Sequence, residues 1–287
     1  MQKLFNSKYP IICAPMNGVS DLNLALACAK AGIIPSLVPY TYTNFKEFFK
    51  DLALYKKETS NDIIIALRLA EVINDKLFTL LPTSGITHIE LLEFTVDELT
   101  EENIFKINSL RDNGIKILLK ILTHNDIEPY KNIIDAVTIK SSEAAGRSEE
   151  GIDLILEIDS ILSKYPNIKI IASGGIKNSN DINQLISKGV SAVSIGTLFA
   201  MSKESSIPIE VKNKLLQSSS NDITRLKSGA CQRAIIFDEQ SNDDFNNTRG
   251  LNTGLRTGNS GHIFIGNAID TVTEILPVQE IVNHLVA

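Results

Sequence analysis

The sequence predicts a single (β/α)8 barrel followed by a C-terminal extension. Short apolar, β-branched runs alternate with amphipathic stretches through the first 220 residues, and eight such runs can be counted. This alternation is typical of parallel strands covered by helices, and eight is the strand number of the barrel. The 287 residues also fit one barrel with one core.

The predicted strands and helices can be placed in order along the chain. The strands are 11–16, 34–40, 62–69, 88–94, 116–122, 136–142, 169–173 and 192–195. Between them apolar residues recur at helical spacing, as Ile182 and Leu185 do. Gly32, Gly114 and Gly189 stand where helix C-caps are expected.

An open, doubly wound sheet is the alternative architecture for this alternation. It would more often have fewer strands and a glycine-rich turn after the first one. The chain has Asn17-Gly18-Val19-Ser20 at that position and no GxGxxG motif, so the barrel is favoured.

The composition of the sequence changes at about residue 221. It becomes polar and rich in Asn and Gly, before an apolar segment at 263–270 and a predicted helix from about 277. We therefore divide the chain into a barrel, 1–220, and an extension, 221–287, that packs on the barrel as a candidate lid. The length and polarity of 238–262 predict mobility there.

Composition and charge narrow the class of protein. The net charge of −6, with acidic and basic residues interspersed, argues against nucleic acid or a membrane surface as a partner. No apolar stretch reaches the roughly 18 residues of a membrane span, and the first residues lack the pattern of a signal peptide. We expect a cytoplasmic protein. The frequency of C2 dimers among soluble oligomers is the one reason to expect a homodimer.

The three cysteines, Cys13, Cys28 and Cys231, do not indicate a disulfide framework or a thiolate zinc site. Their number is odd and CxxC spacing is absent. Cys13 and Cys28 sit in apolar runs and are expected to be buried, reduced thiols. No His, Asp or Glu pair shows metal-ligand spacing within a larger cluster, so no metal is expected.

Two glycine loops follow the last two predicted strands. The seventh strand runs into Ser173-Gly174-Gly175, and the eighth runs into Gly196-Thr197. Glycines let backbone N–H groups approach a phosphate, and the Thr197 hydroxyl can donate to the same group. Either loop alone could be an ordinary tight turn. Barrels commonly bind phosphate at these two strands, however, so the pair predicts a phosphate site.

Five short segments together carry a family resemblance. They are Ala14-Pro15-Met16 after Tyr9-Pro10, Glu143-Ala144-Ala145-Gly146, 171–176, 195–200 and Gly266-Asn267-Ala268. In this combination the chain resembles the FMN-dependent nitronate monooxygenases, also called 2-nitropropane dioxygenases, and the related flavin-dependent enoyl-ACP reductases. The resemblance implies that FMN is the cofactor.

The resemblance also assigns residues to the cofactor. It implies that the backbone of Ala14, Pro15 and Met16 lies against the flavin ring and that the two glycine loops hold the phosphate. A lysine that ends the fifth strand approaches the flavin in this family, and Lys120 stands at that position. A lysine at the inner end of an apolar strand needs an anion, which a reduced flavin or its phosphate would supply, unless the side chain reaches solvent.

The chain departs from the family at the catalytic histidine. The nitronate-oxidising members carry a histidine directly after the last glycine of the EAGG-type segment, and here that residue is Arg147. Arginine cannot serve as an ordinary general base, but it can hold a carboxylate, a nitro group or a phosphate bidentately. Glu143 is expected to orient Arg147, or to act as a base if desolvated.

Two further cations stand where the family has other residues. Arg68 replaces an asparagine, and Lys140 replaces a smaller polar or acidic residue. We expect Arg68, Lys140 and Arg147 to converge on the mouth of the pocket, where they would favour an anionic substrate or grip the phosphate. Each one taken singly could equally be a solvated or salt-bridged charge.

The four histidines offer few replacements for the missing base. His124 follows the fifth strand and His262 borders the candidate lid, so these two could contact the substrate. His88 and His284 are expected to be structural or on the surface.

The sequence therefore predicts an FMN-dependent oxidoreductase that acts on a small organic substrate. Nitronate oxidation is the nominal reaction, and O2 or a nicotinamide cofactor is the redox partner. An enoyl-thioester reductase is the nearest alternative. A non-redox phosphate-binding barrel, such as a lyase or isomerase, or a catalytically degenerate flavin binder would belong to another class.

Overall fold

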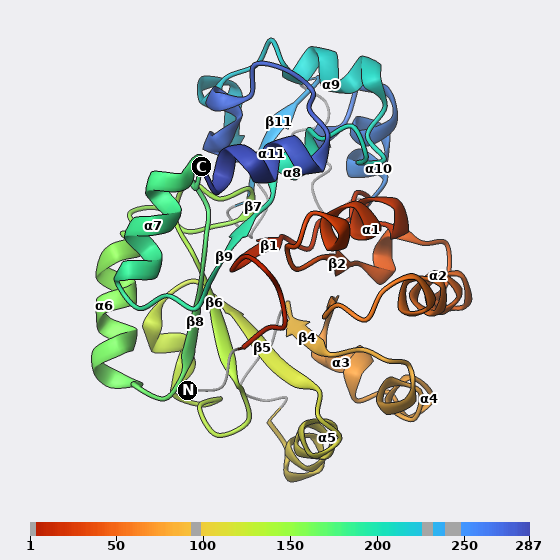
Figure 1. Ribbon diagram of the computed structural model, residues 1–287, viewed down its shortest axis with the longest axis vertical. Coiled ribbons are helices and arrows are strands. Elements are labelled where there is room, and N and C mark those ends of the chain that lie inside the picture. The colour runs from red at the N-terminus through yellow and green to blue at the C-terminus, as the bar shows by residue number, and fades with distance from the viewer. Residues whose placement is uncertain (1–3, 93–98, 226–231, 239–247) are drawn as a thin grey trace.

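The computed structural model describes residues 4–92, 99–225, 232–238 and 248–287 (Figure 1). Within these ranges eight parallel strands form one sheet in the order β1-β9-β8-β6-β5-β4-β3-β2. They are β1 (Ile11–Cys13), β2 (Ser36–Leu37), β3 (Ile64–Leu67), β4 (His88–Leu91), β5 (Lys116–Ile121), β6 (Ala136–Lys140), β8 (Lys169–Ser173) and β9 (Ala192–Ile195). A parallel bridge between Ile12 and Ile34 joins the two edges. The predicted barrel is confirmed, and the open sheet is wrong.

Every predicted strand is present, but several are shorter than their apolar runs. The first ends at Cys13 and the second covers only Ser36–Leu37. Pro15 and Pro39 follow these strands closely, and proline has no N–H to donate to a ladder. Pro39 instead begins a 3-10 turn, Pro39–Thr41. Residues 93 and 94 of the fourth predicted strand lie outside the described ranges.

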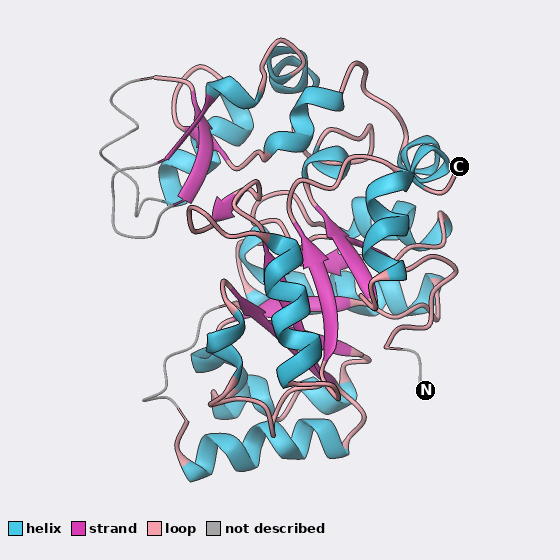
Figure 2. Ribbon diagram, turned by 90° about the vertical axis from the view of Figure 1, so that its left-hand side faces the viewer, coloured by secondary structure: helices cyan, strands magenta, loops and turns pink. Residues whose placement is uncertain are grey.

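Helices cover the outside of the barrel, and others lie with the extension (Figures 1 and 2). They are α1 (Leu22–Lys30), α2 (Phe45–Glu58), α3 (Leu69–Val72), α4 (Asp75–Phe78), α5 (Glu101–Asp112), α6 (Leu154–Lys164), α7 (Ser179–Ser187), α8 (Thr197–Ala200), α9 (Ile209–Leu215), α10 (Thr248–Thr257) and α11 (Val278–Leu285). Asp21, Asn44 and Asn178 accept hydrogen bonds from the first turns of α1, α2 and α7. Gly114 and Gly189, with φ of 86° and 105°, follow helix ends as predicted.

The hydrophobic core has two parts, as the alternation of side chains along a barrel strand requires. The inner part fills the barrel and contains Phe5, Ile12, Ile34, Ile64, Leu118, Ala136, Ile171 and Ala192. The larger outer part lies between the strands and the helices. Cys13 and Cys28 belong to the outer part as buried free thiols, as predicted, and Cys231 lies outside the described residues.

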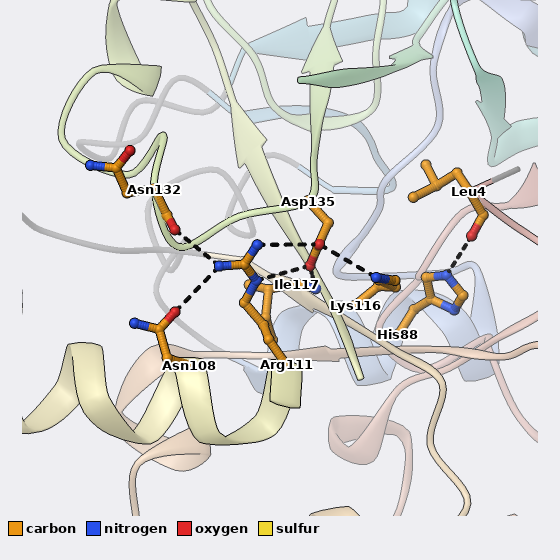
Figure 3. A network of polar contacts seen from close by, with 8 residues as sticks. All are labelled: Leu4, His88, Asn108, Arg111, Lys116, Ile117, Asn132 and Asp135. Atoms are coloured by element: carbon orange, nitrogen blue, oxygen red, sulfur yellow. Dashed lines mark hydrogen bonds and ion pairs between the residues drawn. The ribbon is translucent and has the colours of Figure 1, made fainter. Parts of the chain in front are cut away.

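Polar contacts tie the amino ends of β4, β5 and β6 together (Figure 3). The Asp135 carboxylate accepts hydrogen bonds from the backbone N–H of Ile117 at 2.9 Å and from Arg111 Nε at 3.3 Å. His88 Nε2 lies 3.0 Å from the Leu4 carbonyl oxygen, and its ring packs on Phe5. His88 is thus a structural residue of the end opposite the strand carboxyl termini.

The extension pairs with a loop of the barrel. Strands β10 (Ile223–Arg225), β11 (Gln232–Ile236) and β12 (His262–Ile263) form an antiparallel sheet, and β11 also pairs with β7 (Gly146–Arg147). Strand β7 belongs to the loop after β6, so extension and barrel share backbone hydrogen bonds there. The division at residue 220 and the role of a lid remain predictions. The segment 238–262, predicted to be mobile, lies partly outside the described residues; its described part includes α10.

No helix in the described part of the chain is both long enough and apolar enough to span a membrane.

Replacing Asp135 by alanine should lower the free energy of unfolding by about 1–3 kcal/mol, because the N–H of buried Ile117 loses its side-chain acceptor and Arg111 loses its carboxylate partner. Urea unfolding of the purified protein measures this loss. The control is Asp159→Ala, which removes the exposed pair with Lys188 and should cost less than about 1 kcal/mol. Equal losses in the two variants would contradict the structural role of Asp135.

Candidate active site

A cavity of about 1360 Å³ opens at the carboxyl ends of the barrel strands. Its barrel side is lined by the segments that follow β1, β3, β5, β6, β8 and β9, and its other side by α10 and the segment 263–268. Every residue predicted to contact the cofactor lines it: Ala14, Pro15, Met16, Arg68, Lys120, Lys140, Ala145, Gly146, Ser173, Gly174, Gly175, Gly196 and Thr197. Glu143 and Arg147 line it too, whereas His124 does not. Their direct contact with a cofactor stays a prediction.

The loop after β8 has no room for side chains at its two glycines. Gly174 and Gly175 have φ of 94° and 73°, a region that L side chains rarely adopt. A Cβ at Gly174 would lie 2.5 Å from Ser141 Oγ and 2.7 Å from Ala144 Cβ. Glycine is therefore required at both positions by the backbone conformation and by close packing against the loop after β6.

The loop after β9 is shaped by contacts with the extension. Thr197 Oγ1 accepts a hydrogen bond from the backbone N–H of Gly266 at 3.0 Å, which leaves its hydroxyl hydrogen for another acceptor. A Cβ at Gly196 would lie 3.6 Å from Met16 Sδ, an ordinary contact. The glycine cradle formed by Gly174, Gly175 and Gly196 therefore fits the phosphate of FMN, with Thr197 as a further donor.

Lys120 has a protein carboxylate as its anionic partner. Its Nζ lies 2.8 Å from Glu90 Oε2, and Glu90 Oε1 accepts a hydrogen bond from Thr138 Oγ1 at 2.7 Å. The side chain of Glu90 is 3% exposed. The expectation that flavin must neutralise Lys120 is therefore wrong, and so is the alternative of a solvated lysine. Glu90 lies two residues after the inward-facing His88, so strand alternation could have revealed this partner.

Lys140 does not lie at the mouth of the cavity, contrary to prediction. It is only 9% exposed, and its Nζ donates hydrogen bonds to the carbonyl oxygens of Ala145 at 2.9 Å and Arg147 at 2.5 Å. Burial, together with the charges of Lys120 and Arg147, lowers the pKa of Lys140 to about 7, and the charge of Glu90 opposes this shift. Lys140 is buried because the loop after β6 folds back over its side chain.

Arg147 and Arg68 both line the cavity with exposed side chains. The Arg68 guanidinium lies 5.6 Å from the centre of the Tyr40 ring, within cation–π range. Two of the three predicted cations thus face the opening. Among the described residues no ion pair joins Glu143 to Arg147. The Glu143 carboxylate lies beside Gly175 instead. The expected orientation of Arg147 by Glu143 is therefore not seen.

Two arginines of the extension, which the sequence analysis missed, hold the loop that carries Arg147. Arg233 Nη1 donates to the Ser142 carbonyl oxygen at 2.8 Å, and its Nη2 donates to Asn267 Oδ1 at 2.6 Å. Arg225 Nη1 donates to the Ser148 carbonyl oxygen at 3.0 Å. No local pattern marks these residues, because the contacts span more than 70 positions.

Histidine is absent from the described residues that line the cavity. His124 points to α6. Its Nδ1 lies 2.8 Å from Glu157 Oε2, and its backbone N–H donates to the same oxygen at 2.6 Å. Its proposed contact with substrate is therefore wrong. His262 is buried beside Phe264, and burial lowers its pKa. Within the described ranges His, Cys, Asp and Glu form no group that could hold a metal ion.

The barrel places its glycine cradle at the carboxyl ends of its last two strands, where barrels commonly bind phosphate. The family model described as nitronate monooxygenase matches residues 135–287, which is more than half of the chain. The chain belongs to the nitronate monooxygenase family. As a member of this family it is an FMN-dependent oxidoreductase.

Solved structures with the same fold are similar over almost the whole chain. FabK from Thermotoga maritima has a TM-score of 0.83 and 20% identity, over 97% of this chain and 92% of that one. Nitroalkane oxidase from Streptomyces ansochromogenes has a TM-score of 0.79 and 18% identity, over 97% of this chain and 95% of that one. At these identities the likeness establishes the fold.

A curated relative is the tryptophan synthase alpha chain of Sulfurisphaera tokodaii. It is 23% identical over 166 residues, which cover 54% of this chain and 64% of that protein. The match thus spans less than two thirds of the relative's length.

Replacing Gly196 by valine should weaken FMN binding roughly 100-fold while the barrel stays folded. The fold has room for a Cβ at this position, so the branched side chain would enter the space of the phosphate. Fluorescence titration of the apoprotein with FMN measures the affinity, and circular dichroism checks the fold. Gly114→Ala, at a glycine distant from the cavity, should bind FMN normally. Undiminished binding by Gly196→Val would contradict this placement of the phosphate.

Proposed function

We propose that this oxidoreductase oxidises small anionic substrates of the nitronate class, with Arg147 as the anion-binding residue in place of a histidine base. One observation carries the proposal. The cavity brings the cofactor-binding segments together with Arg147, and its described lining contains no histidine.

The residues that line the cavity support one orientation of FMN. The glycine cradle of Gly174, Gly175 and Gly196 would hold the phosphate, and Ala14, Pro15 and Met16 line the same cavity where the ring would rest. FMN would accept the electrons of the substrate, and O2 would reoxidise the reduced flavin. The protein contributes binding, orientation and the exclusion of water.

The chemistry of arginine selects the form of the substrate. A nitroalkane must lose its α-proton before it can be oxidised, whereas a nitronate has already lost it. A guanidinium group has donors and no acceptor, so Arg147 cannot take that proton. Its guanidinium can donate two parallel hydrogen bonds to the paired oxygens of a nitronate. The site therefore suits the preformed anion and is poorly equipped for the neutral nitroalkane.

Reduction of an enoyl thioester is a second candidate, supported by the apolar wall of the cavity. Leu251 and Leu255 of α10 lie on this wall with Ile263 and Phe264, and together they would accommodate an acyl chain. This reaction requires a nicotinamide cofactor as the electron donor. Anaerobic mixing with NADH or NADPH would bleach the flavin rapidly if this second function were correct.

Arg147→Ala should raise the nitronate concentration needed for half-maximal flavin reduction by about 10–100-fold, because charge-assisted hydrogen bonds contribute about 1.5–3 kcal/mol. Arg147→His should gain reduction by the neutral nitroalkane, because imidazole can accept the α-proton. Anaerobic stopped-flow spectroscopy at the flavin absorbance, with propyl-1-nitronate and 1-nitropropane, measures both effects.

The matched control is Arg256→Ala, which removes an exposed arginine of α10 that lies outside the cavity. It should behave as the wild type. Equally fast reduction of the wild type by the neutral nitroalkane, or an Arg147→Ala variant with unchanged nitronate dependence, would overturn the proposed function.

A further inference from the structure

Lys140 is a buried cation without a carboxylate partner among the described residues. It ends β6, is 9% exposed, and makes its two hydrogen bonds to backbone carbonyl oxygens, those of Ala145 and Arg147. The nearby carboxylate of Glu90 is engaged by Lys120 and Thr138. Burying an ammonium group this way is costly, so a specific role in the loop that it contacts is worth seeking.

That loop, residues 141–148, has little regular structure of its own and is held through its carbonyl groups. Arg233 donates to those of Ser142 and Ala144, and Arg225 to that of Ser148, both from the extension. Lys140 donates to two more, those of Ala145 and Arg147, from the barrel side. One of its acceptors is the carbonyl group of Arg147 itself, so this bond fixes the backbone from which the anion-binding side chain projects.

We propose that Lys140 is the positioning residue for Arg147: its ammonium group holds the loop 141–148 in the conformation that presents the guanidinium to the cavity. This inference rests on the proposed function, because it assumes that Arg147 binds the substrate anion. It explains, in addition, what holds Arg147 in position.

The proton on Lys140 matters because a charged donor makes hydrogen bonds roughly twice as strong as a neutral one. The groups that face Lys140 are Lys120 on β5, Glu90 on β4 and Arg147 on β7, and with burial they leave its pKa at about 7. Because this pKa is lowered, Lys140 is charged below about pH 7 and loses its charge as the pH rises above it. Anion binding at Arg147 should therefore weaken in the alkaline direction.

Lys212 provides a matched control in the same chain. It is also buried, at 3% exposure, and its Nζ donates to two backbone carbonyl oxygens, those of Ser202 at 2.5 Å and Ser205 at 3.0 Å. Burial lowers its pKa as well. Lys212 does not line the cavity, so its removal perturbs a buried lysine without touching the loop.

The test is the dissociation constant of inorganic nitrate, a planar oxyanion, measured by isothermal titration calorimetry on the FMN-loaded protein at about pH 6 and about pH 9. In the wild type, nitrate binding should weaken about tenfold between the two values. In Lys140→Met it should be about tenfold weaker than the wild type at the lower pH and should no longer depend on pH. Lys212→Met should follow the wild type at both values.

Lys140→Gln serves if Lys140→Met does not fold, because a neutral amide can still donate to the loop. It should bind nitrate with intermediate affinity and without pH dependence. Wild-type binding that is equal at the two pH values, or a Lys140 variant with the wild-type pH dependence, would overturn the inference. Arg147→Ala separates the two levels: if it binds nitrate like the wild type, the proposed function itself fails, whatever the Lys140 variants do.

Discussion

The site depends on the satisfaction of the carbonyl groups in the loop 141–148. A loop that packs beneath other chain segments cannot leave these groups without donors, because a buried unpaired carbonyl costs about as much as a lost hydrogen bond. Cationic side chains supply donors to five of them, Lys140 from the barrel and Arg225 and Arg233 from the extension. The same contacts join the two parts of the chain around the cavity.

Several other features follow from the position of this loop. Its start packs so closely on the turn after β8 that only glycine fits at Gly174. Its middle lies against Gly266. A Cβ added at this glycine would lie 2.8 Å from the Glu143 carbonyl oxygen. Gly266 in turn donates to Thr197 at the start of α8. Gly266 thus brings the extension, the loop and the glycine cradle into contact.

The barrel interior directly beneath the cavity contains charged side chains. The inner hydrophobic core lies further from the cavity. On three adjacent strands, Glu90 forms an ion pair with Lys120 and accepts a hydrogen bond from Thr138. Removal of one partner from such a group leaves an uncompensated charge, which is more damaging than the pair is stabilising. Lys140 lies next to this group as a further positive charge, so the barrel offers an electropositive floor to the anions that FMN and its substrate bring.

Much of the fold could be predicted from the sequence, because strand and helix patterns are local. Barrel topology also brought the predicted cofactor residues to one cavity, since the carboxyl ends of parallel strands meet at one face. The partners of Lys120 and Lys140 could not be predicted in the same way. Glu90 and the carbonyl groups of the loop reach them only through tertiary folding, and Arg225 and Arg233 come from far along the chain. His124 was misplaced because position on the catalytic face does not fix the direction of a side chain.

The most direct test of this account is a crystal structure of the FMN-loaded protein. The account predicts that the phosphate lies within hydrogen-bond distance of the backbone N–H groups of Gly174, Gly175 and Gly196, while Lys140 Nζ still contacts the carbonyl oxygens of Ala145 and Arg147. A phosphate bound at the mouth of the cavity, between Arg68 and Arg147, would contradict it.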